Sequence, residues 1–215
     1  MGKRIIKILK PILDSVLDII YPEKSNCINC YADDYIGLCP KCINSIKRIK
    51  TEEKIKPFAY YNGAIKKLIL ELKYKNNFLA AKILGEFISA LIKENNIEAD
   101  VILYVPLSKR SYKKRGYNQS KLIANIVSEK CNIEISNSLI KVKNTKEQKT
   151  LSKDERMSNL IDAFDIKDYN EVKNKRVILI DDVVTTGATL LECEKILKKF
   201  NASTINILTV AKSNI

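Results

Sequence analysis

A short apolar run that ends in two carboxylates constrains the fold of this chain more than any other feature. Residues 177–180 (Val-Ile-Leu-Ile) lead directly into Asp181 and Asp182, and a Thr-Thr-Gly-Ala-Thr stretch follows at 185–189. A second apolar run, at residues 101–105, ends at Pro106. Runs that are apolar at every position are typical of central parallel strands, which helices cover on both faces. The two runs therefore predict strands at the centre of a sheet.

Helical patterns alternate with these runs along the chain. A predicted strand at residues 55–61 is followed by two apolar stripes of helical period, at 65–72 and at 79–92. A predicted helix over 189–200 separates the 177–180 run from a last strand at 204–210. Strands that alternate with helices predict an α/β fold with a doubly wound, mainly parallel sheet. The ligand of such a sheet lies beyond the carboxyl ends of its strands.

Four of the six cysteines form two Cys-x-x-Cys pairs near the N-terminus: Cys27, Cys30, Cys39 and Cys42. A two-residue spacer lets a tight turn direct both sulfurs of a pair at one point, so the two pairs together can hold a tetrahedral Zn²⁺ ion. Redox thiols or disulfides are the alternatives, and the tandem arrangement without an export signal favours structural zinc. We expect Cys131 and Cys193, which lie in helical patterns, to pack as small apolar residues.

The first twenty residues carry an apolar stripe of helical period, which Pro11 interrupts. Packing against the rest of the protein and binding to a membrane surface are both compatible with this stripe. No run of 18 apolar residues occurs, so we expect no transmembrane segment and a cytoplasmic protein. The predicted domains are 1–50, with the N-terminal helix and the small zinc-binding segment, and 51–215, with the sheet.

The residues after the 177–180 run have the chemistry of a phosphate and sugar site. The loop consists of Thr185, Thr186, Gly187, Ala188 and Thr189. Its hydroxyls and backbone N–H groups can surround a phosphate at the start of a helix, where the potential is positive. Asp181 and Asp182 can accept hydrogen bonds from two sugar hydroxyls or hold Mg²⁺ through water. Together these residues predict a cradle for ribose 5-phosphate.

This order of strand, acidic pair and Thr-Gly loop resembles the signature of the type I phosphoribosyltransferases. In that family the acidic pair binds the ribose hydroxyls of phosphoribosyl pyrophosphate and the loop binds its 5-phosphate, so the resemblance implies a pentosyltransferase-type site that uses Mg²⁺. Thr185 stands where purine-salvage relatives carry an aspartate that contacts the base, which argues against purine salvage.

Further motifs are similar to those of the ComF family, and this resemblance implies a type I phosphoribosyltransferase fold with an N-terminal double zinc ribbon. They include the 17–22 run Leu-Asp-Ile-Ile-Tyr-Pro and the 105–119 segment, in which Ser108 stands where many members have histidine. The others are Thr145, Gln148, Leu151, Ser152, Glu155, Arg156, Asn159, Ala163 and Phe164. These similarities follow the family order over nearly the whole chain.

The segment after the 101–105 run is strongly basic, and the chain as a whole has a formal net charge of +13. The basic residues are Lys109, Arg110, Lys113, Lys114 and Arg115. We expect Lys109 and Arg110 to bind the pyrophosphate. We expect Lys113, Lys114 and Arg115 to bind the backbone of single-stranded DNA, with Tyr117 stacked on a base. A solvated basic loop without a ligand is the alternative.

The absence of histidine excludes a Ser-His-Asp triad, a Cys-His pair and any His-ligated metal. Three functions stay open. The ComF resemblance implies a protein that binds phosphoribosyl pyrophosphate and single-stranded DNA and acts in DNA uptake during natural transformation, with DNA-processing proteins such as a helicase among its partners. The alternatives are a metabolic phosphoribosyltransferase that transfers ribose 5-phosphate to a small nucleophile, and a zinc-stapled binding module without catalysis.

Overall fold

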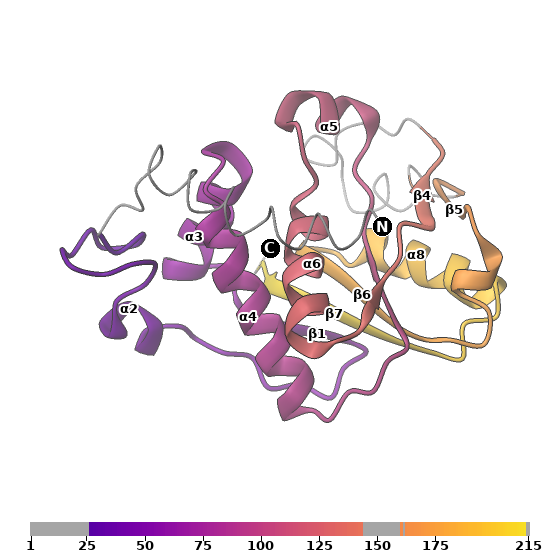
Figure 1. Cartoon of the computed structure of the whole chain (residues 1–215), viewed down its shortest axis with the longest axis horizontal. Coiled ribbons are helices and arrows are strands. Elements are labelled where there is room, and N and C mark those ends of the chain that lie inside the picture. Colours follow the sequence, from indigo (N-terminus) through magenta and orange to yellow (C-terminus); the bar gives the residue numbers. More distant parts are fainter. Residues whose placement is uncertain (1–25, 144–159, 161, 214–215) are drawn as a thin grey trace, which may run out of the picture.

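A five-stranded parallel sheet forms the centre of the molecule (Figure 1). The computed structural model describes residues 26–143, 160 and 162–213. The strands are β1 (Ile55–Tyr60), β2 (Val101–Tyr104), β3 (Glu134–Ile135), β6 (Arg176–Val184) and β7 (Thr204–Lys212). They lie in the order β1-β7-β6-β2-β3, and every neighbouring pair is parallel. The two apolar runs of the sequence are therefore neighbours, as β2 and β6.

Helices cover both faces of this sheet. They are α3 (Gly63–Tyr74), α4 (Phe78–Glu94), α6 (Gln119–Cys131) and α8 (Ala188–Lys199). Alternate residues of the central strands enter different cores. Ile102 and Ile178 pack in the cluster with α3, α4 and α6, whereas Leu103 and Leu179 pack in the cluster with α8. The predicted doubly wound, mainly parallel α/β sheet is confirmed, and burial on both faces explains why the runs are apolar at every position.

The strand β6 is longer than the sequence predicts. The apolar run ends at Ile180, but the strand continues through both carboxylates to Val184. Backbone pairing with β7 causes this extension, because Asp181 is in register with Thr209 and Val183 with Ala211. The acidic pair therefore lies in the paired part of β6, where hydrogen bonding to β7 fixes the backbone.

The basic segment after β2 is a helix, so its description as a loop is wrong. This helix, α5 (Lys109–Arg115), begins at Ser108, whose hydroxyl accepts a hydrogen bond from the backbone N–H of Ser111 at 3.1 Å. Gly116 ends it with a positive φ of 80°. A serine before the first turn and a glycine after the last one are helix-capping signals. They stabilise a single two-turn helix in spite of its five positive charges.

A second, two-stranded sheet lies over the α8 face and was not predicted. It pairs β4 (Leu139–Lys141) with β5 (Phe164–Ile166) in antiparallel register, and a single 3₁₀ turn follows at Tyr169–Glu171. Leu139 and Phe164 are buried in the same cluster as the apolar side of α8. Both strands have only three residues, which is too short for a recognisable alternating pattern.

The segment that carries the four clustered cysteines packs against α3 and α4. It contains the short helix α2 (Pro40–Asn44), and Cys27 and Leu38 belong to the same buried cluster as the apolar faces of α3 and α4. Gly37 lies against α4: its φ is +86°, and a Cβ atom there would come within 2.8 Å of Cδ1 of Ile83. The domain boundary after residue 50 stays a prediction.

Several sequence predictions concern residues outside the described ranges. They are the N-terminal helix over 1–20 and the family-like residues Thr145, Gln148, Leu151, Ser152, Glu155, Arg156 and Asn159. Within the described ranges, no helix combines the length and the apolar character needed to cross a membrane.

Candidate functional site

A cleft of about 750 Å³ at the carboxyl ends of β2 and β6 gathers most of the predicted site residues. Its walls include Asp181 and Asp182, the whole 185–189 loop, and three basic residues of α5, namely Arg110, Lys114 and Arg115. Gln119, from the family-like 105–119 segment, also lines it, as do side chains that the sequence analysis did not single out: Tyr61, Lys73, Tyr74, Ser120 and Lys141. The cleft lies where a doubly wound sheet is expected to bind its ligand.

The two carboxylates of the acidic pair have different partners. Asp181 accepts hydrogen bonds from the hydroxyl of Ser120 at 2.7 Å and from the backbone N–H of Asp182 at 2.9 Å. Asp182 forms an ion pair with Nζ of Lys73 at 2.6 Å. Burial and the negative charge of Asp182 raise the pKa of Asp181 to about 7, although the hydrogen bond from Ser120 opposes the shift. A cation or a pair of hydroxyl donors bound here would favour the ionised form.

Lys73 is a site residue that sequence reasoning missed. It lies at the end of α3, and its pKa is raised because attraction to Asp182 outweighs the opposing effect of burial. One signal was present in the sequence. Ile65, Ile69 and Lys73 follow one another at four-residue steps, so a charged residue continues the apolar row of the helix. A lysine on a buried row implies a buried partner, which here is Asp182.

The 185–189 loop joins β6 to α8 and presents the start of that helix to the cleft. Gly187 precedes the first residue of α8 and has a φ of 78°, a conformation that favours glycine. A Cβ atom at this position would come within 3.2 Å of Ile55. Thr186 accepts a long hydrogen bond, 3.4 Å, from the backbone N–H of Ala188. N–H groups at the start of a helix and threonine hydroxyls are the groups that bind anions, so the loop is suited to an anion.

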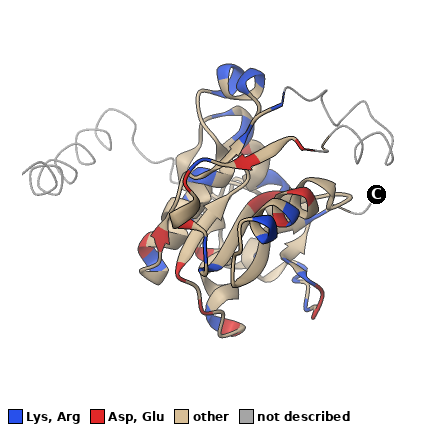
Figure 2. Cartoon of the chain, turned by 90° about the vertical axis from the view of Figure 1, so that its right-hand side faces the viewer, with Lys and Arg blue, Asp and Glu red and all other residues tan. Residues whose placement is uncertain are grey.

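The basic residues of α5 divide into two groups. Arg110, Lys114 and Arg115 line the cleft, whereas Lys109 and Lys113 are exposed and are not part of its walls. Figure 2 shows α5 as a helix rich in Lys and Arg at the top of the molecule, with no acidic residue on it. One face of this helix thus contributes to the cleft, and another is open to solvent.

Tyr117 is held in the protein body. Its hydroxyl donates a hydrogen bond to the backbone carbonyl of Leu72, and its ring packs edge-on against Phe78, with 5.5 Å between the ring centroids. Exposed aromatic rings stand nearby instead: Tyr112 of α5 and Tyr74 of α3 are both 54% exposed. The sequence analysis did not assign Tyr74 a role, although it lines the cleft.

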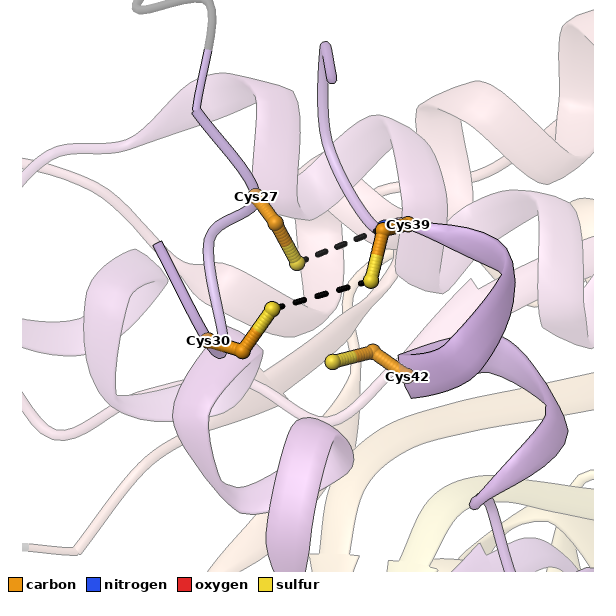
Figure 3. Close-up of side chains that lie close together, drawn as sticks. All are labelled: Cys27, Cys30, Cys39 and Cys42. Carbon is orange, nitrogen blue, oxygen red and sulfur yellow. Dashed lines mark hydrogen bonds between the residues drawn. The ribbon is translucent and has the colours of Figure 1, made fainter. Parts of the chain in front are cut away.

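The four N-terminal cysteines form one cluster (Figure 3). The sulfurs of Cys27, Cys30, Cys39 and Cys42 all lie within 4.8 Å of one another. Zn–S bonds of about 2.3 Å in a tetrahedron require sulfurs roughly 3.8 Å apart, and the sulfurs of Cys30 and Cys39 are 3.6 Å apart. Two N–H groups also point at sulfur, from the Cys39 backbone to Cys27 at 3.3 Å and from Asn29 to Cys42 at 3.2 Å. The cluster can hold a metal ion such as zinc.

The pKa values of two thiols of this cluster, Cys27 and Cys42, are shifted in opposite directions. Burial opposes ionisation of Cys27, but hydrogen bonds from the backbone of Cys30, Cys39 and Asn29 outweigh it and lower the pKa of Cys27 to about 6. For Cys42 the hydrogen bond from Asn29 favours the thiolate, yet burial and the three neighbouring sulfurs raise its pKa to about 12. A divalent ion would stabilise four thiolates at once.

Comparison with a model of known protein families agrees with this fold. Residues 74–215 match the family model of the phosphoribosyl transferase domain. Among solved structures, the chain is similar to adenine phosphoribosyl transferase from Trypanosoma brucei, with a TM-score of 0.48 and 14% identity over 76% of this chain and 73% of that one.

Three curated relatives resemble the chain over most of its length. Competence protein F of Haemophilus influenzae is 31% identical over 179 residues, which cover 80% of this chain and 78% of that protein. Competence protein ComFC of Streptococcus pneumoniae is 26% identical over 93% of this chain and 85% of that protein. DNA utilization protein YhgH of Shigella flexneri is 26% identical over 81% and 78%, respectively. With its phosphoribosyltransferase-type sheet and its four-cysteine segment, the chain belongs to the ComF family.

Proposed function

We propose that this protein binds phosphoribosyl pyrophosphate with Mg²⁺ in the cleft and single-stranded DNA on α5, and that it acts in the cytoplasm in DNA uptake during natural transformation. One observation carries the proposal. The acidic pair lies near the end of β6 and is separated from the 185–189 loop only by Val183 and Val184. This loop leads into α8 and lines the same cleft. Carboxylates for sugar hydroxyls and a helix start for a phosphate are the two recognition elements that ribose 5-phosphate needs.

The sugar phosphate is held at one side of the cleft. Asp181 and Asp182 accept hydrogen bonds from the ribose hydroxyls, and the N–H groups and hydroxyls of Thr185, Thr186, Gly187, Ala188 and Thr189 bind the 5-phosphate. The raised pKa of Asp181 supports this role, because a carboxylate whose charge is poorly compensated gains most from hydroxyl donors or a cation. Lys73 forms an ion pair with Asp182, which lines the cleft.

The pyrophosphate lies toward β2, where α5 supplies cations. Arg110 lines this side of the cleft and is the arginine that we expect to contact it, with Lys109 at the start of the same helix. Mg²⁺ prefers carboxylate and phosphate oxygens, so Asp181 and Asp182 are the residues that would hold it. When bound, the ion would neutralise charge on the leaving pyrophosphate.

Single-stranded DNA binds along the open side of α5. Lys113 is exposed outside the cleft, Lys114 is exposed and also lines the cleft, and the helix itself contains five basic residues and no acidic one. Arg115 and Tyr117, predicted from the sequence for the same surface, are half-buried, so their access to DNA is smaller. Electrostatic contact with phosphates is largely independent of sequence, which suits DNA of any origin.

Zinc has a structural role in this proposal, with Cys27, Cys30, Cys39 and Cys42 as its ligands. The relatives named competence proteins support the assignment to natural transformation. DNA-processing proteins such as a helicase are the partners that we expect.

The test is isothermal titration of one preparation with phosphoribosyl pyrophosphate and Mg²⁺, and separately with a single-stranded oligonucleotide. The double variant Asp181→Asn, Asp182→Asn should bind the sugar donor roughly 100-fold more weakly or worse, because each charge-assisted hydrogen bond contributes about 1.5–3 kcal/mol. Glu134→Gln is the matched control. Glu134 is exposed and pairs with Val101, at the opposite end of β2 from the cleft.

The outcomes separate the candidate functions. Equal binding of the sugar donor by the double variant and the wild type would move the ligand out of this cleft. A wild type that binds the sugar donor but no oligonucleotide at low salt would favour the metabolic phosphoribosyltransferase. A wild type that binds only the oligonucleotide would favour a binding module without catalysis.

A further inference from the structure

The corner between α3 and α4 carries two exposed aromatic rings. Tyr74 is the last residue of α3 and Phe78 is the first residue of α4, and they are 54% and 56% exposed. The residues between them, Lys75, Asn76 and Asn77, are polar. Single exposed apolar side chains are normal on a protein surface, whereas two rings on one polar corner form a patch that a ligand can use.

Both rings are held in place by the segment at the end of α5. The guanidinium of Arg115 lies over the ring of Tyr74, with 5.9 Å to the centroid. The ring of Tyr117 packs edge-on against Phe78, with 5.5 Å between the centroids, and its hydroxyl donates a hydrogen bond to the carbonyl of Leu72 in the last turn of α3. A side chain that is already held loses little freedom when a ligand contacts it. The two rings are therefore preorganised.

The charges beside this corner attract phosphate. The exposed Lys114 and the half-buried Arg115 line the same cleft as Tyr74. The carboxylate of Glu71, one turn before Tyr74, is paired with Nζ of Lys75 at 2.9 Å. Its negative charge is thus compensated at the corner, while α5 supplies positive charge next to the rings.

Exposed rings beside basic side chains are the combination that binds single-stranded nucleic acids, because bases stack on the rings and phosphates contact the charges. The lysines of α5 attract the phosphates of single strands and of duplexes alike. In a duplex, however, each base is paired and stacked on its neighbours, so it must be extruded before it can stack on a side chain. Rings at this position add a preference that charge alone cannot supply.

We propose that Tyr74 and Phe78 form a base-stacking platform by which this protein selects single-stranded over double-stranded nucleic acid. The inference rests on the proposed function, in which DNA binds at α5, and deepens it by assigning the selection of unpaired bases to the α3–α4 corner. Tyr117, which the sequence predicts to stack on a base, supports the ring of Phe78 instead.

The double variant Tyr74→Leu, Phe78→Leu tests the platform. Leucine keeps an apolar side chain at both positions and changes no charge, but it offers no ring to a base. We expect at least about tenfold weaker binding of oligothymidylate, measured by fluorescence anisotropy, because stacking on each ring is lost. The salt dependence should be unchanged, since the basic residues are intact. Binding of a duplex of the same length should change by less than about twofold.

A strand of abasic residues provides a second measurement that needs no variant. It has the phosphates of oligothymidylate but no bases to stack. The wild type should bind it at least about tenfold more weakly than oligothymidylate of the same length. The leucine double variant should bind the two strands with nearly equal affinity, because the rings that distinguish them are gone.

Two control proteins separate stacking from other effects of the substitutions. Tyr74→Phe with Phe78→Tyr keeps both rings, so it should bind oligothymidylate within about twofold of the wild type. Tyr35→Leu removes a ring that is 40% exposed on the cysteine segment, which lies on the other side of α3 and α4 from α5 (Figure 1). This variant should bind oligothymidylate as the wild type does.

The results that overturn the inference are distinct from those that overturn the proposed function. A leucine double variant that binds single strands as tightly as a binding-competent wild type overturns the platform alone, and so does equal binding of the abasic strand and oligothymidylate by the wild type. Loss of sugar-donor binding with unchanged oligonucleotide binding would assign Tyr74 to the ligand of the cleft and also overturn it. A wild type that binds no oligonucleotide at low salt overturns the DNA part of the proposed function and the inference with it.

Discussion

At the scale of single residues, the cleft is arranged for a ligand at a cost to the stability of the free protein. Asp181 is enclosed beside a second carboxylate, and its pKa is raised to about 7 by burial and by the charge of Asp182. Gln119 has a buried donor without a partner among the described residues. Both features disfavour the empty cleft and both are relieved by a suitable ligand, which is common at functional sites.

The pKa of Asp181 leads to a prediction on stability. An ordinary value of 3.8 rises to about 7 in the folded protein, so the folded state binds this proton more tightly than the unfolded chain. The free energy of unfolding therefore falls as the pH rises from about 4 to 7. Asp181→Asn keeps an oxygen for Ser120 but has no charge, so we expect it to melt a few degrees above the wild type at pH 8 without ligand.

Thermal melts at two pH values check this expectation. At about pH 3 the carboxyl of Asp181 is mostly protonated in both the folded protein and the unfolded chain, so the two melting temperatures should nearly coincide. A variant that melts below the wild type at pH 8 would contradict the assigned cause of the shift.

Lys73 provides a second prediction at this scale. Lys73→Gln leaves the largely buried Asp182 carboxylate without its ion pair, and only 13% of that side chain is exposed. We expect a loss of about 1–3 kcal/mol in the free energy of unfolding at pH 7, measured by urea denaturation. Lys66→Gln, on the exposed side of the same helix, should change it by less than about 0.5 kcal/mol.

A double variant separates the ion pair from other effects of the lysine. In a background with Asp182→Asn, the unpaired charge is absent, so Lys73→Gln should cost clearly less. Equal losses in the two backgrounds would mean that Lys73 stabilises α3 in some other way.

Sequence reasoning found the residues that form a contiguous motif and missed those that reach the cleft from elsewhere. Asp181, Asp182 and the 185–189 loop follow one another in the chain, so their joint chemistry is visible in the sequence. Lys73 and Ser120 contact them from α3 and α6, and these contacts depend on how the helices pack. The lack of a hydrogen-bond partner for Nε2 of Gln119 could not be predicted, because it depends on which side chains pack around this atom in the folded protein.

At the scale of elements, α5 is a short, highly charged helix that stands apart from the packed layers. None of its residues is buried, and its last turn holds Lys113, Lys114 and Arg115. Positive charges in the last turn interact favourably with the helix dipole. The caps at Ser108 and Gly116 and this dipole, rather than a core contact, stabilise the element.

The exposed lysines of α5 should control the salt dependence of DNA binding. Binding to single strands has a slope of log affinity against log salt of about −0.7 per phosphate contact. Lys113→Gln with Lys114→Gln should therefore flatten the slope by up to about 1.4, measured by fluorescence anisotropy of an oligonucleotide from low to high salt. The matched double variant Lys82→Gln, Lys93→Gln removes two exposed charges from α4 and should leave the slope unchanged. An unchanged slope in the α5 variant would place the DNA elsewhere.

The sequence predicted helices and strands accurately where burial of apolar side chains determines the element. It was less accurate where strand pairing or helix capping determines the element. The helices α3, α4 and α8 and the strands β1 and β2 agree with the sequence prediction to within a few residues, because their apolar patterns are long or uninterrupted. The extension of β6 to Val184 depends on pairing with β7, and α5 depends on its caps. A search for apolar periods detects neither effect.

At the scale of the whole molecule, the cysteine segment and the sheet domain share one core. Cys27, Cys39 and Cys42 are buried in the same cluster as the apolar faces of α3 and α4. Tyr31 of this segment also accepts a hydrogen bond from Nζ of Lys67 on α3 at 2.6 Å. A segment of this size needs a staple to stay folded, so the loss of a metal bound by the four cysteines would expose one side of the main core.

Metal removal should therefore affect stability more than ligand binding. We expect chelation, or Cys39→Ser, to lower the melting temperature by several degrees, with Cys131→Ser at the end of α6 as the control that changes it little. Below the melting temperature, affinity for phosphoribosyl pyrophosphate should change by less than about threefold, because the proposed ligand site is formed by β6, the 185–189 loop and α5. Metal analysis should find one zinc per chain in the wild type, and stoichiometric zinc at unchanged affinity in Cys39→Ser would contradict the four-ligand site.

The strand order also determines when this fold can form. β7 lies between β1 and β6, yet it follows both of them in the chain. While the protein is being synthesised, β1 can pair only with residues 47–49 on one edge, and its other edge stays unpaired until Thr204 and the residues after it have left the ribosome. The contacts that complete the sheet have very high sequence separation, so they close late and slowly. A nascent chain arrested before β7 would expose one unpaired edge of β1 and one of β6. Unpaired edges of apolar strands aggregate, so we expect a chaperone to bind such a chain.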